Sequence, residues 1–336
     1  NCKGGGQMKL GIIGAGMIVH DFLTFASEIP NLDLQAICAT IAEKEVIEHL
    51  ADSNNINKTY TDFKEFLLDE DVDTVYVAVP NHLHFQFSKD SLNAGKHVIC
   101  EKPFTSNLRE AKELFELAES KHLFIFEAVS TRFLPNVQKI KEELPKLGNI
   151  KIFTANYSQY SSRYDAFKSG ETLPAFDPQK SGGALMDLNI YNINLVVTLF
   201  GKPDNIDYHA NIQRGIDTSG ILVLDYPTFK FVGIAAKDCK APIMTNIQGD
   251  EGCISVDSSA NIVSQFTLSL NTKDSKTETM NINHGKHRMF HEFEAFISII
   301  ENEDFSQTKY LQDITLTTMD IQTTARLKAG ILFPSD

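Results

Sequence analysis

The sequence predicts an α/β fold in which a doubly wound parallel sheet is followed by an α+β domain with a large, open, mostly antiparallel sheet. Over the first ~125 residues, short apolar runs alternate with segments of helical periodicity, which is typical of parallel strands joined by helices. After about residue 128 the pattern changes to short β-rich runs separated by turn residues, which indicates an antiparallel or mixed sheet. The chain has 336 residues, enough for two domains, and we predict them at residues 1–128 and 129–336.

The first domain is predicted to contain five strands with helices between them. The run Thr74–Val79 is nearly continuous in apolar residues, as expected for a parallel strand covered on both faces. Asn107 and Asp62 each precede a helical pattern and are each followed three residues later by a glutamate, which predicts two capped helices. The predicted strands are Lys9–Ile13, Leu32–Ala39, Thr74–Val79, His97–Cys100 and Leu123–Phe126.

The second domain is predicted to combine a sheet with three helices. One helix is expected between Gly183 and Leu199, and two more at Met289–Glu301 and Leu311–Leu327. The runs that predict strands are Ile221–Leu224, Phe229–Val232, Ile243–Ile247 and Gly252–Val256.

Composition argues against several classes of partner. A net charge of −13 opposes binding to nucleic-acid phosphates or to anionic lipid. No apolar stretch approaches the ~20 residues needed to span a bilayer, so no membrane partner is expected. Residues 1–7 contain no apolar segment of the signal-peptide type, and Met8 is expected to be the native start.

The cysteines indicate a cytoplasmic protein. Their number is odd and no two have C-x-x-C spacing, so neither a disulfide framework nor a zinc site, nor any other metal site, is expected. Reduced thiols fit better, at Cys2, Cys38, Cys100, Cys239 and Cys253.

The first strand leads into a glycine turn that is typical of dinucleotide binding. Gly14 and Gly16 allow a tight turn and close backbone approach, and the next helix begins at Met17 and Ile18, whose amides would face a pyrophosphate. Val19 stands where a full fingerprint has glycine or alanine. A merely structural turn is the alternative.

The end of the second strand bears on the choice between NADP and NAD. An acid there holds the 2′-hydroxyl of NAD, and an arginine accommodates the 2′-phosphate of NADP. The chain has neither at Cys38–Ile41. The absent carboxylate favours NADP, with Thr40 as a phosphate donor; equally, Thr40 caps a helix and Lys44 faces solvent.

The tripeptide Glu101-Lys102-Pro103 directly follows the predicted strand His97–Cys100. A lysine at the carboxyl end of such a strand points into the crevice where open α/β sheets bind ligands, and its desolvated ammonium can move protons near neutral pH. Pro103 stiffens the turn. The alternative is a solvated pair of Glu101 and Lys102.

Asp187 and Tyr191 form a second candidate site. They are four residues apart on one face of a predicted helix, after the pair Gly182 and Gly183, which we interpret as a flexible helix start. The alternative is an aspartate favoured by the helix dipole and a half-buried tyrosine.

The chain resembles the Gfo/Idh/MocA family of NAD(P)-dependent oxidoreductases over nearly its whole length, and the block ending in Glu101-Lys102-Pro103 is the most specific part. The resemblance implies an N-terminal Rossmann domain and a C-terminal open sheet that often forms the oligomer interface. The matching segments are Gly11–Gly16, Val79–Asn81 with His84, Ala94–Pro103, Gly182–Asp187 with Tyr191, Gly201–Pro203, and His287–Met289 with Glu292 and Phe296.

The resemblance also implies site residues and chemistry. Lys102 and Asp187 are expected at the substrate, with Tyr191 similar to the tyrosine of glucose–fructose oxidoreductase and the dihydrodiol dehydrogenases. The reaction would be hydride transfer between NAD(P) and a secondary alcohol of a sugar, polyol or diol. Tyr191 would exchange the hydroxyl proton while Lys102 lowers its pKa, or Lys102 would carry the proton itself. The residues expected at the cofactor are Gly14, Gly16, Met17, Ile18, Thr40, Pro80, Asn81, His84, Glu101 and Lys102.

The remaining expectations concern the pocket, the assembly and competing functions. Tyr164 lies in a polar–aromatic stretch with Tyr157, Tyr160, Arg163 and Lys168 that lines a polyol pocket or packs in an interface. Arg132 contacts substrate or forms a surface ion pair. Asn189 replaces a usual glycine of the family.

The protein is expected to be a homodimer or homotetramer through the C-terminal sheet. Competing functions are a non-catalytic NAD(P)- and sugar-binding regulator and an NAD-dependent, redox-assisted glycosidase.

Overall fold

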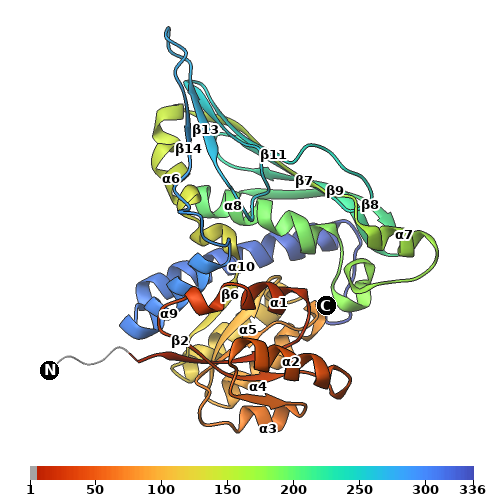
Figure 1. Cartoon of the computed structure of the whole chain (residues 1–336). Coiled ribbons are helices and arrows are strands. Elements are labelled where there is room, and N and C mark those ends of the chain that lie inside the picture. Colours follow the sequence, from red (N-terminus) through yellow and green to blue (C-terminus); the bar gives the residue numbers. More distant parts are fainter. Residues whose placement is uncertain (1–5) are drawn as a thin grey trace, which may run out of the picture. The chain divides into compact units, whose positions relative to one another are not determined.

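The computed structural model describes residues 6–336, which form two compact units (Figure 1). The first unit contains the chain up to Thr105, residues 109–128 and residues 289–315. The second unit contains residues 106–108, 129–288 and 316–336. The first unit is therefore assembled from segments that lie on both sides of the second unit in the sequence.

The first unit is built on a parallel sheet with strand order β3-β2-β1-β4-β5-β6. The chain leaves β1 towards one edge and later returns to add strands towards the other. Because crossovers between parallel strands are right-handed, the connecting helices fall on opposite faces, as predicted for a doubly wound sheet. The strands are β1 Met8–Ile13, β2 Leu32–Cys38, β3 Lys58–Tyr60, β4 Thr74–Val77, β5 His97–Glu101 and β6 Ile125–Ala128.

The helices of the first unit begin close to where the sequence predicts. The Asp62 carboxylate accepts hydrogen bonds from the amides of Lys64 (2.8 Å) and Glu65 (3.2 Å), which confirms the predicted cap. The next predicted start, after Asn107, is also observed. The helices are α1 Met17–Leu23, α2 Lys44–Asn54, α3 Phe63–Leu67, α4 His84–Asn93, α5 Leu108–Ser120 and α9 Phe290–Asn302.

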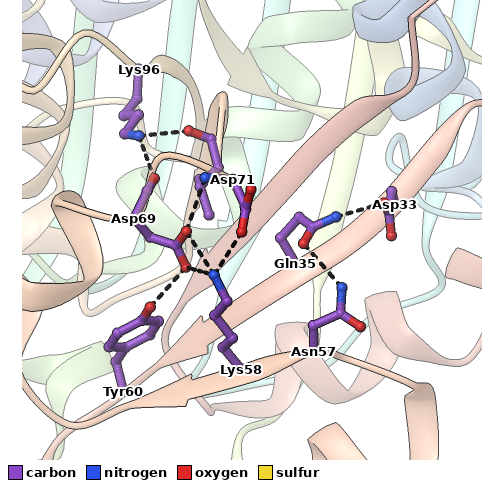
Figure 2. Close-up of polar contacts among 9 residues, drawn as sticks. Asp33, Gln35, Asn57, Lys58, Tyr60, Asp69, Asp71 and Lys96 are labelled. Atoms are coloured by element: carbon purple, nitrogen blue, oxygen red, sulfur yellow. Dashed lines mark hydrogen bonds and ion pairs between the residues drawn. The ribbon is translucent and has the colours of Figure 1, made fainter.

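A polar cluster fastens the edge strand β3 to the loop before β4 (Figure 2). The Lys58 ammonium lies 3.1 Å from the Asp69 carboxylate and 2.8 Å from that of Asp71, and the Tyr60 hydroxyl donates to Asp69 at 2.8 Å. Lys96 donates to the backbone carbonyls of Asp69 (2.7 Å) and Val72 (2.6 Å). A strand of only three residues, which the periodicity had not revealed, is thus held by side chains as well as by its ladder.

The second unit contains an eight-stranded sheet of order β14-β13-β12-β11-β7-β10-β9-β8. Only the central pair β7 and β10 is parallel among the described strands, so the predicted mostly antiparallel sheet is confirmed. Helix α8 lies along one face of this sheet and packs on its central strands (Figure 1). The elements are β7 Ile150–Ser158, β8 Asn205–Gln213, β9 Ile216–Asp225, β10 Lys230–Ala236, β11 Met244–Gly249, β12 Gly252–Val256, β13 Phe266–Leu270, β14 Thr277–Met280, α6 Pro135–Glu143, α7 Ser162–Lys168 and α8 Ile190–Phe200, with α10 at Phe305–Lys328.

One helical stretch corrects the expectation that no segment has the length and apolar content to span a bilayer. Residues Pro178–Phe200 pass that test by length and composition, but 89% of their apolar window is buried inside the protein. This is the burial of a core helix.

The cysteines that the structure describes form no disulfide. Cys38 and Cys100 are buried, Cys253 is half-buried and Cys239 is exposed. Cys2 lies outside the described residues.

Candidate active site

The turn after β1 has the geometry that a dinucleotide pyrophosphate needs. Gly14 has φ +121°, and a Cβ there would lie 2.2 Å from the Ala78 carbonyl oxygen, so only glycine fits. A Cβ at Gly16 would meet nothing within 4 Å, which leaves open space above the backbone where α1 begins. Val19, the departure from the fingerprint, is fully buried and fills the core. The turn therefore fits the cofactor that the fold implies, with Met17 and Ile18 at the helix start.

The end of β2 carries an acid that the sequence interpretation missed. The Glu43 carboxylate accepts from the Thr40 amide at 3.1 Å and from the Thr40 hydroxyl at 2.8 Å, which is a capping box. The predicted cap at Thr40 is thus observed, while Lys44 forms an exposed ion pair with Glu48. The Thr-x-x-Glu spacing of Thr40 and Glu43 is the sequence signal for this carboxylate, which lies two residues beyond Ile41.

The turn that carries Lys102 is held on both sides of the lysine. Glu101 is buried, accepts from the Tyr76 hydroxyl at 2.6 Å, and accepts from the Lys102 amide at 3.2 Å. The Lys102–Pro103 peptide is cis, and the next amide, Phe104, donates to the buried Glu127 carboxylate at 2.9 Å. Glu101 is therefore no solvated partner of Lys102; it fixes the lysine's own backbone.

His84 joins this turn to the end of β4. Its Nδ1 lies 2.6 Å from the Pro103 carbonyl oxygen and its Nε2 lies 2.8 Å from that of Val79. Burial lowers the His84 pKa to about 4, against the pull of the two carbonyls, which favour imidazolium. The ring is 1% exposed and holds the protein's own backbone, so a direct contact between His84 and a cofactor stays a prediction. Pro80 and Asn81 open the 3₁₀ turn between β4 and α4.

Asp187 lies in a π-helical turn, Leu185–Asn189, that leads into α8. Such turns are rare and occur often at functional sites, and sequence periodicity gives no sign of them. Tyr191 follows on the first turn of α8, is 8% exposed, and stacks on Tyr157 with ring centroids 6.1 Å apart. The Asp187 side chain keeps 32% of its surface exposed.

The glycine pair before Asp187 serves close packing, not flexibility as we had expected. Gly183 has φ +109°, and a Cβ there would lie 2.1 Å from an Asp217 carboxylate oxygen. The same carboxylate accepts from the Leu185 amide at 2.8 Å and from the Tyr208 hydroxyl at 2.5 Å. Burial raises the pKa of Asp217 to about 6. Asp217 thus fixes the start of the helical segment that carries Asp187.

Lys237 is the ion-pair partner of Asp187 and was absent from the sequence prediction. Its ammonium contacts Asp187 Oδ2, and its side chain is only 4% exposed. Lys237 directly follows strand β10, just as Lys102 follows β5 by one residue. The signal that drew attention to Lys102, a lysine at a strand end, therefore also marks Lys237.

Asn189, the second departure from the family pattern, is accommodated by a glycine on the sheet. Its side-chain amide donates to the Gly233 carbonyl oxygen at 3.1 Å and its oxygen accepts from Asn192 at 3.0 Å. A Cβ at Gly233 would lie 2.7 Å from that oxygen. The larger residue thus ties the π-helical turn to β10.

The aromatic stretch around Tyr164 forms a cluster in the second unit. Gln213 donates to the Tyr164 hydroxyl at 3.0 Å, and the Lys168 ammonium lies 5.2 Å from the ring centroid. Phe176 packs on Tyr164 at 5.8 Å and also lies 5.8 Å from the Lys237 ammonium, so the cluster approaches the Asp187 ion pair. Both interpretations of Tyr164, pocket and packing, stay open.

Arg132 is not the surface ion pair that we had offered as one alternative. It is 3% exposed, and its Nε donates to the Asn194 side chain on α8 at 2.8 Å. The structure places Lys102 in the first unit and Asp187, Tyr191 and Tyr164 in the second, so their joint action on one substrate stays a prediction.

The fold and these sites define an oxidoreductase with a nucleotide-binding domain of the Rossmann type. The sequence model described as "Oxidoreductase family, NAD-binding Rossmann fold" matches residues 8–128, and that of the GFO/IDH/MocA C-terminal domain matches residues 138–255. The chain belongs to the GFO/IDH/MocA family and is an NAD(P)-dependent oxidoreductase.

Curated relatives and solved structures agree with this assignment. Scyllo-inositol 2-dehydrogenase (NADP(+)) IolU of Bacillus subtilis is 35% identical over 331 residues, covering 98% of this chain and 99% of that protein. Trans-1,2-dihydrobenzene-1,2-diol dehydrogenase of Mus musculus is 30% identical over 225 residues, covering 66% of this chain and 65% of the relative. The 3-ketoreductase KijD10 of Actinomadura kijaniata, with NADP and TDP-benzene, shares the fold with a TM-score of 0.82 at 18% identity, covering 96% of this chain and 97% of that chain.

Proposed function

We propose that this enzyme transfers a hydride between NADP and a secondary alcohol of a cyclic polyol, a sugar or a related diol. The observation that carries the proposal is the buried turn that fixes Lys102 at the end of β5, in a chain similar over nearly its whole length to an NADP-dependent inositol dehydrogenase. The relatives named above act on an inositol and a cyclic diol.

The cofactor would carry the hydride, and the protein's residues would bind and orient the substrate and move the hydroxyl proton. The amides after Gly14 and Gly16 would hold the pyrophosphate, Thr40 the adenosine ribose side, and Pro80 with Asn81 the nicotinamide side. In this proposal Tyr191 would exchange the hydroxyl proton and Lys102 would stabilise the developing alkoxide. In the competing version, Lys102 carries the proton itself.

Turnover of a polyol and aldose panel with NADP tests the function. Net NADPH production is expected. Lys102→Met should lower kcat/KM by far more than tenfold, where a tenfold loss corresponds to about 1.4 kcal/mol of transition-state stabilisation. Lys121→Met, at an exposed lysine beyond α5, is the matched control and should keep wild-type kinetics. A tightly held cofactor without net turnover would point instead to a regulator or a redox-assisted glycosidase. A loss below tenfold in Lys102→Met would reject both proton-transfer versions.

The preference for NADP has its own test at Glu43. The Glu43 carboxylate, which accepts from Thr40, would repel a 2′-phosphate, so it weakens the NADP preference that was predicted from the absence of an acid at Cys38–Ile41. Glu43→Gln should raise the ratio of kcat/KM for NADP to that for NAD several-fold. An unchanged ratio would show that the adenosine ribose lies elsewhere.

We also propose that the open sheet face of the second unit joins copies into a dimer or tetramer. Met244, Asn156, Ile234 and Ile221 are registered side by side across four strands, and Met244 and Ile221 are 43% and 44% exposed. A charge in this row should dissociate the assembly, so Ile221→Lys measured by light scattering should be monomeric. A wild-type monomer would reject this assembly.

A further inference from the structure

Lys237 lies close enough to two carboxylates to influence both, yet it forms an ion pair with the more exposed one. Its ammonium contacts Asp187, whose side chain is 32% exposed, whereas Asp217 is 1% exposed and is bonded by Leu185 and Tyr208. The Lys237 charge still acts on Asp217, because it works to lower the pKa of that carboxyl. The Lys237 ammonium thus forms its ion pair with Asp187, the carboxylate that is partly exposed to solvent.

The burial of Lys237 fixes this choice. Its side chain is 4% exposed, its amide donates to the Thr218 carbonyl oxygen at 2.9 Å, and the Phe176 ring lies 5.8 Å from its ammonium. A buried ammonium without a partner is strongly unfavourable, so Lys237 holds the Asp187 carboxylate facing it. The backbone that carries Asp187 is fixed as well, because the nearby Leu185 amide donates a hydrogen bond to the Asp217 carboxylate.

We propose that Lys237 is a positioning residue for the reaction: its ammonium keeps Asp187 ionised and aimed, so that Asp187 accepts a hydrogen bond from a substrate hydroxyl and does not donate one. This inference rests on the proposed function. It specifies the substrate class further, because an ionised carboxylate has no proton to give and requires a donor on the ligand. The substrate should therefore present a hydroxyl that donates to Asp187.

The first test measures the ion pair without any substrate. Thermal unfolding is compared for the wild type, Lys237→Met, Asp187→Asn and the double variant. Asp187→Asn should lower Tm by several degrees because it strands a buried ammonium, and the double variant should be no less stable than Asp187→Asn. Lys58→Met, at a lysine paired in the other unit, should combine additively with Asp187→Asn. Additive effects of Lys237→Met and Asp187→Asn would overturn the proposal.

The second test measures positioning, with scyllo-inositol and NADP as the probe pair, well below the Tm of each variant. Lys237→Met should lower kcat/KM at least tenfold, Lys237→Arg should restore it to within threefold, and Lys237→Met should add nothing to Asp187→Asn. A merely structural lysine would leave the kinetics of the folded protein within threefold, and that outcome overturns the proposal. If the wild type turns over no polyol, the proposed function fails, and the stability cycle alone decides whether Lys237 holds Asp187.

Discussion

The first unit buries Asp69 and the second buries Asp217, and the two aspartates differ in what the neighbouring lysine does. Asp69 receives the Lys58 ammonium at 3.1 Å together with hydrogen bonds from Tyr60 and from the Asp71 amide. Asp217 receives a tyrosine and a backbone amide, but its lysine neighbour, Lys237, is paired with another acid. In the first unit the lysine is paired with the buried aspartate itself. In the second unit the buried lysine, Lys237, is paired with a different and more exposed aspartate, Asp187.

The pKa values follow this difference. Burial works to raise the pKa of Asp69, but the hydrogen bonds from Tyr60, the Asp71 amide and Lys58 outweigh it, and the net pKa is lowered. Burial dominates at Asp217 and raises its pKa to about 6. The first arrangement stabilises an edge strand. The second contains a buried carboxyl whose ionisation lowers stability as pH rises, because its lysine neighbour is paired with Asp187.

The largest expected difference between the two units comes from replacing the lysine-paired aspartates, Asp187 and Asp69, with asparagine. Asp187→Asn should lower kcat/KM on a polyol by about a hundredfold or more, because it replaces a charged acceptor with a weaker neutral one, adds an N–H donor, and removes the counter-charge of a buried ammonium. Asp69→Asn should leave kcat/KM within threefold and lower Tm instead. Steady-state kinetics and thermal unfolding on both variants check this. Equal kinetic losses would show that Asp187 is structural like Asp69.

Asp217 should give stability a pH dependence that Asp69 cannot. An acid with a raised folded pKa contributes its stability below its unfolded value of 3.8 and loses it as pH rises through about 6. Between pH 4 and 7 the wild type should therefore lose about 2 kcal/mol of unfolding free energy relative to Asp217→Asn. Urea unfolding of both proteins across this range measures the difference. A constant difference would mean that Asp217 ionises with an ordinary pKa in the folded protein.

The sequence predicts the doubly wound parallel sheet and the mostly antiparallel character of the second sheet, because periodicity and turn residues are local signals. It predicts the Asp62 cap and the Gly14 turn for the same reason. It misses β3, a three-residue strand whose own Lys58 pairs with Asp69 in the loop before β4. It also misses the π-helical turn around Asp187. Asp217 is also hidden from sequence reasoning, because it lies in β9, separated from Gly183 by α8 and β8, yet its carboxylate explains why that glycine is required. Lys237 carried a local signal at a strand end, but its partner could be known only from the folded chain.

The smallest expected effect is at Lys58, and it sharpens the contrast with Lys237. The Lys58 side chain is 40% exposed, and the buried Asp69 carboxylate that its removal leaves without a cation keeps its hydrogen bonds from Tyr60 and the Asp71 amide. Lys58→Met should therefore lower Tm by no more than about 3 °C, with a smaller effect in high salt because exposed pairs are screened. Thermal unfolding at low and high salt measures this. A large, salt-independent loss of Tm would mean that Lys58 behaves like the buried Lys237. The different exposure of the two lysines would then no longer explain why one ion pair supports the fold while the other orients Asp187.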